Sequence, residues 1–202
     1  MKITEHTMPR DACRYATNTL RRRWPEAEII ILKDAEAAYF YARDVIKGRW
    51  PEAESVIQQH ALAADGYALH VIKGRWPEAE PTIMQNAQAA RSYANNILRR
   101  RWPEAEPTIM QDAMVVYDYA RYIIKDRWIE AEYLISQNDY ASRAYLEVFF
   151  PNTEVVTKDQ IDDYSWAKAG AIGYFAPKEL FKHRPCSLLD TLLEERAQEA
   201  II

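Results

Sequence analysis

Apolar residues recur along the chain with the spacing of a helix. In one segment Ala38, Tyr41, Ala42, Val45 and Ile46 follow an i, i+3, i+4, i+7, i+8 order, which is the buried face of an amphipathic helix. The same face returns as Ala64, Tyr67, Ala68, Val71 and Ile72, and again as Ala90, Tyr93, Ala94, Ile97 and Leu98. A separate isoleucine recurs with it, at Ile31, Ile57, Ile83, Ile109 and Ile135. The pattern predicts an all-α chain.

A period of 26 residues governs this pattern. The motif Arg-Trp-Pro-Glu-Ala-Glu begins at Arg23, Arg49, Arg75 and Arg101, and at Arg127 it reads Arg-Trp-Ile-Glu-Ala-Glu. Residues 8–23 resemble half of a preceding repeat, and residues 128–152 form a divergent fifth one. Because one such unit cannot bury its own apolar face whereas stacked neighbours can, we expect an α-solenoid over residues 1–152. The composition changes after this array, and residues 153–202 are expected to form a small helical C-terminal cap.

Each repeat carries signals for two helices. The short first helix should start at the motif proline, which suits the first helical position. In the third and fourth repeats a second proline, Pro81 or Pro107, should delay that start, with Glu80 or Glu106 as the cap. The second helix should end at Gly48 or Gly74, where glycine can take the left-handed conformation. Its expected N-caps are Asp34, His60, Asn86, Asp112 and Asn138.

Residues that every repeat shares are interpreted as its frame. We expect the tryptophans to pack across the junctions between repeats, because aromatic rings dominate core packing; a base-stacking ladder is the other reading. The motif arginine is expected to pair with the glutamate three residues later, as Arg23 with Glu26, along one edge. This Arg/Lys edge leaves nucleic-acid binding open as an alternative function. The tryptophans are Trp24, Trp50, Trp76, Trp102 and Trp128.

The opposite face of the second helix differs from repeat to repeat. Its residues are unusually large and apolar or aromatic for a face whose opposite side already supplies a core, and they share helical spacing. One interpretation is a protein-binding surface with tyrosine and arginine anchors; the other is packing within the solenoid. The candidate partner-binding residues are Tyr39, Phe40, Arg43, Met114, Tyr117, Arg121 and Tyr122.

Composition narrows the classes of function. The chain has 202 residues, 49% of them hydrophobic, and a net charge of −4 at pH 7. It is long enough for a sizeable core and is not a strongly basic nucleic-acid binder. Its two cysteines, Cys13 and Cys186, make no disulfide framework, and neither a secretion signal nor a membrane span is visible. We therefore expect a cytoplasmic protein with no membrane partner.

Motifs of catalysis and metal binding are missing from the sequence. There is no glycine-rich phosphate loop, no activated-serine motif and no set of histidines and cysteines with metal-ligand spacing. We expect no enzymatic activity, no cofactor and no metal. A binding protein is the remaining class, with a self-associating homo-oligomer as a further alternative.

The segment Tyr-Ala-Arg-Asp-Val-Ile-Lys-Gly-Arg-Trp-Pro-Glu-Ala-Glu, residues 41–54, resembles a repeat found in uncharacterised proteins of bacteriophages and related mobile elements. The resemblance covers residues 11–135. It implies a helical array and supplies no activity or site residues. The phage association implies a host protein as partner, for instance a defence protein that this chain would inhibit.

Overall fold

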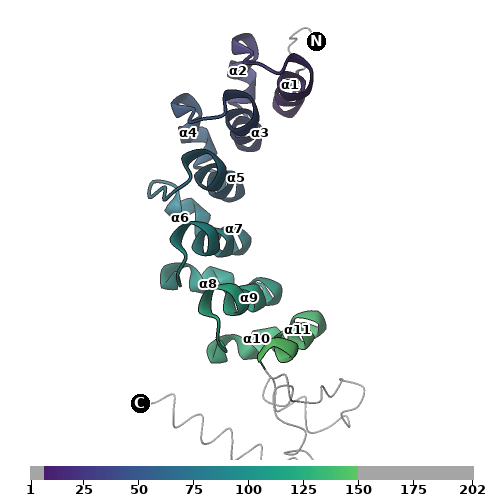
Figure 1. The fold of residues 1–202 in the computed structure, drawn as a ribbon, viewed down its shortest axis with the longest axis vertical. Helices are drawn as coiled ribbons and strands as arrows, with labels where there is room; N and C mark the ends of the chain where they lie inside the picture. The colour runs from purple at the N-terminus through teal and green to yellow at the C-terminus, as the bar shows by residue number, and fades with distance from the viewer. Residues whose placement is uncertain (1–6, 150–202) are drawn as a thin grey trace, which may run out of the picture. The chain divides into compact units, whose positions relative to one another are not determined.

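The computed structural model describes residues 7–149, and its regular secondary structure within that range is helical throughout. Within each of the two compact units described below, helices that follow one another in the sequence pack together (Figure 1). The chain divides into two compact units, Met1–Gln111 and Asp112–Ile202, which are described separately below. No helix within the described range has the length and apolar character to cross a membrane. The expected C-terminal cap, residues 153–202, lies outside the described residues.

In the first unit, longer second helices alternate with short first helices. Each second helix consists of an α-helical part that continues directly into a π-helical turn, and within this unit α1 packs on α3, α3 on α5 and α5 on α7. The short helices pack between them. The second helices are α1 (Pro9–Tyr15, then Ala16–Leu20), α3 (Ala35–Tyr41, then Ala42–Ile46), α5 (Ala61–Tyr67, then Ala68–Ile72) and α7 (Ala87–Tyr93, then Ala94–Leu98). The short helices are α2 (Pro25–Ile31), α4 (Pro51–Ile57), α6 (Glu80–Ile83) and α8 (Glu106–Ile109).

The second unit has the same kinds of element. Helix α9 (Ala113–Tyr119) continues into the π-helical turn Ala120–Ile124. A 3₁₀ turn, Ile129–Ala131, precedes the short helix α10 (Glu132–Ser136), and α11 (Asp139–Phe149) follows. Helices α9, α10 and α11 all pack against one another.

The second helices start where the sequence predicts. All five expected N-cap side chains accept a hydrogen bond from a backbone N–H in the first turn. The Asp34 carboxylate accepts from Ala37 at 2.8 Å, and the His60 ring nitrogen Nδ1 accepts from Ala63 at 3.3 Å. Asn86, Asp112 and Asn138 make the equivalent bonds.

The short helices divide as expected between early and late starts. Helices α2 and α4 begin at the motif proline, whereas α6 and α8 begin at Glu80 and Glu106, one residue before the second proline. The expectation that these glutamates act as caps was wrong. The N-cap positions are Ala79 and Ala105, without a side-chain cap, and both glutamates instead bind the motif arginines.

The ends of the second helices correct the glycine prediction. The left-handed residues are Lys47 and Lys73, each with φ of 59°, and not the glycines that follow them. The π-helical turn ends the helix one residue earlier than expected, so that the N–H groups of Lys47 and Gly48 both donate to the Ala42 carbonyl. A left-handed residue at position 47 makes this possible, and a lysine at a helix C-terminus is favoured by the helix dipole.

The predicted apolar face forms the core. In each repeat the tyrosine of the second helix and the isoleucine of the short helix are completely buried, and the alanines beside them are buried as well. Val45 and Ile46, at the C-terminal end of that face, are half-buried. The largest fully buried side chains include Tyr41, Tyr67, Tyr93, Tyr119 and Tyr145, together with Ile31, Ile57, Ile83, Ile109 and Ile135.

Candidate functional site

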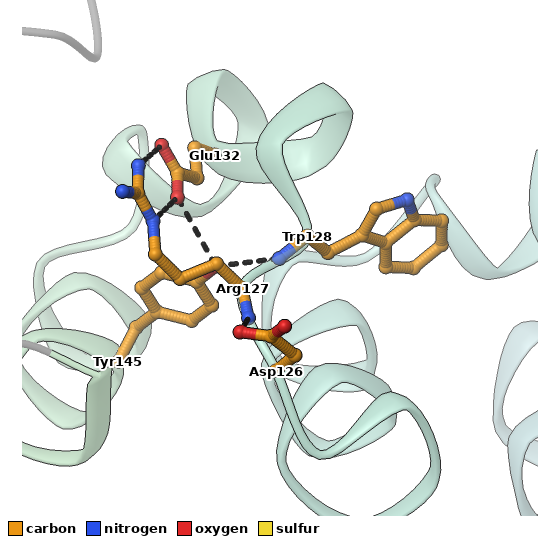
Figure 2. Close-up of polar contacts among 5 residues, drawn as sticks. All are labelled: Asp126, Arg127, Trp128, Glu132 and Tyr145. Carbon is orange, nitrogen blue, oxygen red and sulfur yellow. Dashed lines mark hydrogen bonds and ion pairs between the residues drawn. The ribbon is translucent and has the colours of Figure 1, made fainter.

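A polar network joins the short helix to the second helix in the first, second, third and fifth repeats, and Figure 2 shows it at Tyr145. The Tyr145 hydroxyl accepts a hydrogen bond from the backbone N–H of Trp128 at 2.8 Å and donates one to the Glu132 carboxylate at 3.3 Å. That carboxylate binds both Nε and Nη2 of Arg127, at 2.7 and 2.9 Å. Tyr41, Tyr67 and Tyr93 occupy the same place in the earlier copies.

The ion pairs of this network differ from the predicted ones. The motif arginine binds the glutamate five residues later, and not the first glutamate of the motif such as Glu26, which is exposed. The reason is the tyrosine hydroxyl, which fixes the second glutamate beside the arginine. The observed pairs include Arg23–Glu28, Arg49–Glu54, Arg75–Glu80, Arg101–Glu106 and Arg127–Glu132.

Burial and hydrogen bonding shift the pKa values of this network in opposite directions. Burial, followed by the bond to Glu54, raises the pKa of Tyr67 to about 12. The hydrogen bonds from Arg49 lower the pKa of Glu54, with a smaller contribution from Tyr67. At neutral pH the tyrosine is therefore a neutral donor and the glutamate an ionised acceptor, as the geometry requires.

The tryptophan rings belong to the core. Each packs against the tyrosine of the preceding second helix, as Trp76 does against Tyr67 with ring centroids 5.2 Å apart. Trp50, Trp76, Trp102 and Trp128 are at most 6% exposed, so their faces cannot stack on nucleic-acid bases. Trp24 is half-buried. The structural interpretation of the tryptophans is therefore confirmed for these four.

The variable face splits into a buried row and exposed rows. Tyr39 and Tyr117, two of the predicted binding residues, are only 7% and 5% exposed. Phe40 and Tyr122 are 40% and 47% exposed, Arg121 is exposed, and Arg43 and Met114 are half-exposed. The face thus provides packing at one position of the first, second and fourth repeats, through Tyr39, Asp65 and Tyr117, and accessible surface at other positions.

The structure brings the predicted residues of the first repeat into one cluster. The Arg43 guanidinium lies over the rings of Tyr39 and Phe40, 5.3 and 4.8 Å from their centroids, which are cation–π distances. It donates to the Tyr39 hydroxyl at 3.1 Å. Asp44 accepts from Nε and Nη2 of Arg43 at 2.7 and 2.9 Å. We call these four residues the first arginine cluster.

A second cluster occupies the corresponding positions of the fourth repeat. Arg121 lies 5.8 Å from the Tyr117 ring centroid and 5.1 Å from that of Tyr122, and its Nη1 donates to the Tyr117 hydroxyl. We call these three residues the second arginine cluster. Met114, the remaining candidate, makes no polar or ring contact with these three residues, and its backbone N–H donates to the Asp112 carboxylate.

Buried pairs between neighbouring second helices were missed by the sequence analysis. A Cβ on Gly66 would lie 2.7 Å from the Tyr39 ring, so glycine is needed for this ring to fit. Asp65 is 7% exposed, and one of its carboxylate oxygens has no hydrogen-bond partner. Burial raises the pKa of Asp65 to about 6, against smaller opposing effects of a hydrogen bond from Ser92 and the charge of Arg91. In the sequence, this contact could have been recognised from a large residue, Tyr39, that lies 27 positions before a glycine, Gly66.

One open groove lies between α1 and α3. Its volume is about 300 Å³, and its lining includes Arg10, Arg14, Phe40 and Asp44 with the buried Cys13 thiol. Burial raises the pKa of that thiol, so it is a weak nucleophile at neutral pH. Within residues 7–149 no three histidine, cysteine or acidic side chains lie close enough together to hold a metal ion.

Charges of both signs meet at the repeated basic edge. Glu52 acts on Arg23, and Glu104 acts on Arg75, in each case through its charge from the following repeat. A phosphate backbone placed along such an edge would meet carboxylates as well as cations.

Comparison of the chain with protein-family models, with curated proteins and with solved structures finds no match.

Proposed function

We propose that this chain is an α-solenoid without enzymatic activity, which binds another protein through the exposed part of the variable face. The observation that carries the proposal is the pair of arginine clusters. Both place an arginine on two aromatic rings at the same positions of two different repeats. Arginine and tyrosine are enriched among the residues that dominate interface energies.

Several features support protein as the class of partner. Four of the five motif tryptophans that could have stacked on bases are buried, and the basic edge carries carboxylates as well as cations. The resemblance to phage-associated repeats makes a host protein, such as a defence component that the chain would inhibit, the partner to look for first. This last step is analogy and adds no residue to the site.

Affinity capture with matched variants tests the proposal. The full chain is immobilised and incubated with host lysate, and captured proteins are identified by mass. We expect one protein to be lost when Arg121→Gln and Tyr122→Ala are combined, and to be retained by the edge control Lys47→Gln. Capture of nucleic acid alone, released by salt and lost in the control variant, would establish the basic-edge function instead.

Self-association is the second proposed function, and exposed apolar side chains on α10 and α11 favour it. Tyr140 is 72% exposed, Tyr133 63%, and Ile129, in the turn before α10, 55%. Large exposed apolar surface often marks an interface. Light scattering coupled to size exclusion decides the matter, because a monomer of 23.6 kDa at all concentrations removes this function.

A further inference from the structure

Both arginine clusters have a tyrosine and an arginine at equivalent positions. The acid and the second aromatic residue, however, occupy opposite positions in the two clusters. In the first repeat the aromatic residue is Phe40 and the acid is Asp44. In the fourth repeat the corresponding positions hold Asp118 and Tyr122. This exchange changes what lies at the edge of the guanidinium.

In the first cluster each of the three guanidinium nitrogens donates a hydrogen bond within the cluster. Asp44 takes its Nε and Nη2 edge with two bonds, at 2.7 and 2.9 Å, and the Tyr39 hydroxyl takes Nη1 at 3.1 Å. Two parallel N–H···O bonds between arginine and a carboxylate are the strong, directional form of this pair. The chain itself therefore shows which ligand this arginine–tyrosine arrangement accepts.

In the second cluster the same edge is open. The Tyr117 hydroxyl takes Nη1 of Arg121, and the two rings hold the guanidinium plane. Asp118 acts on Arg121 through its charge, but no carboxylate of residues 7–149 forms an ion pair with Arg121. Arg121 and Tyr122 are both exposed. A ligand can therefore reach Nε and Nη2 from solvent.

We propose that the second arginine cluster receives a carboxylate side chain from an acidic segment of the partner protein. The carboxylate binds Nε and Nη2 of Arg121 as Asp44 binds Arg43, and the Tyr122 ring covers the apolar part of the incoming side chain. This inference rests on the proposed protein-binding function and names the chemistry of the partner.

A direct titration tests the site. The probe is an acetylated and amidated peptide of four glutamates flanked by glycines, and the matched control has four glutamines. The readout is the Nε–Hε signal of each arginine in the ¹⁵N-labelled full chain, assigned through Arg→Lys variants. We expect the glutamate peptide to shift the Arg121 signal and leave the Arg43 signal in place, and the glutamine peptide to shift neither.

Exchanging the two clusters gives the matched variants. Asp118→Phe combined with Tyr122→Asp copies the first cluster into the fourth repeat. The new carboxylate at position 122 should bind Nε and Nη2 of Arg121 and thereby weaken binding of the glutamate peptide about tenfold or more. Phe40→Asp combined with Asp44→Tyr opens the first cluster and should create a second responding arginine. Circular dichroism verifies that both variants remain folded, and Asp44→Asn alone, which should also free Arg43, replaces the second exchange if it does not fold.

The outcomes separate this inference from the function on which it rests. Equal shifts with both peptides, an unchanged Arg121 signal, or a tighter response to a short single-stranded DNA than to the glutamate peptide overturns carboxylate recognition. If the captured protein is lost with Tyr122→Ala but retained with Arg121→Gln, protein binding stands and the carboxylate inference fails.

Discussion

The frame and the variable face of this protein use the same helices in opposite ways. In the frame, identical residues make identical bonds in successive copies of the first unit, as Tyr41 and Tyr67 do with Trp24 and Trp50 at 2.6 and 2.7 Å. On the variable face, equivalent positions keep their geometry and change their chemistry, as Asp44 and Tyr122 do beside two similarly held arginines. The repeat therefore fixes where a side chain lies and leaves its chemical nature to each copy.

Removing a ring from the frame should have the largest effect. Trp76 is 4% exposed and packs on Tyr67, so Trp76→Ala should lower the free energy of unfolding by about 3–5 kcal/mol. Trp24→Ala should cost less, because Trp24 is only half-buried. Chemical denaturation of both variants measures the difference, and equal losses would contradict a frame whose strength depends on position along the array.

Closing the space beside Tyr39 should show that one position of the variable face also belongs to the core. Gly66→Ala places a Cβ 2.7 Å from the Tyr39 ring, and overpacking of this kind costs about 1–3 kcal/mol. With Tyr39→Leu the clash is removed, and Gly66→Ala should then be neutral or stabilising, since alanine is the better helix former. A double-mutant cycle measures this coupling, and additive effects would disprove the contact.

Removing one hydroxyl from the frame should cost less than removing a ring. Tyr67→Phe leaves the Trp50 N–H without its acceptor, which costs about 1–3 kcal/mol for a buried group. The same hydroxyl helps to lower the pKa of Glu54. A carboxylate whose pKa is lowered in the folded state stabilises the fold at pH values above its ordinary pKa. That stabilisation is lost as the pH falls through the lowered pKa. Acid unfolding of Tyr67→Phe should therefore begin at a higher pH; an unchanged acid midpoint would contradict this role.

The buried acid of the variable face should give an effect of opposite sign, confined to neutral and higher pH. Because the folded pKa of Asp65 is raised from 3.8 to about 6, its ionisation destabilises the fold above that pH, and the penalty disappears as the pH falls towards 4. Asp65→Asn should raise the free energy of unfolding by about 1–3 kcal/mol at pH 7 and by little at pH 4. Urea melts at the two pH values test this, and a pH-independent difference would rule it out.

The sequence predicts the frame well because repetition averages out local ambiguity. The N-caps, the delayed starts at Glu80 and Glu106, and the buried tyrosines and isoleucines follow from patterns that occur several times. Three details were wrong. Glu80 and Glu106 do not cap their helices, and the other two errors have physical reasons. The left-handed residue moved from Gly48 to Lys47 because a π-helical turn shortened the helix, and the arginine partner moved to Glu28 because a tyrosine 13 residues later fixes that carboxylate.

The candidate site could be predicted only in part. Helical spacing placed Tyr39, Arg43, Tyr117 and Arg121 on a common face, and the structure joins them in two clusters. Helical spacing could not reveal that Tyr39 and Tyr117 are buried, because their burial depends on how closely neighbouring helices pack. The sequence also could not show that, among the described residues, a carboxylate binds the guanidinium of Arg43 but not that of Arg121, since this depends on the direction of the Asp44 side chain.

The bond between each tyrosine hydroxyl and a tryptophan amide also gives the protein a set of intrinsic kinetic probes. The amides of Trp50 and Trp76 lie outside any helix, yet each donates to a completely buried tyrosine. Fraying of a helix end does not release them; only separation of the two helices of that copy does. In a hydrogen-exchange experiment the Trp50 and Trp76 amides would therefore report, copy by copy, how often each pair of helices parts in the native state.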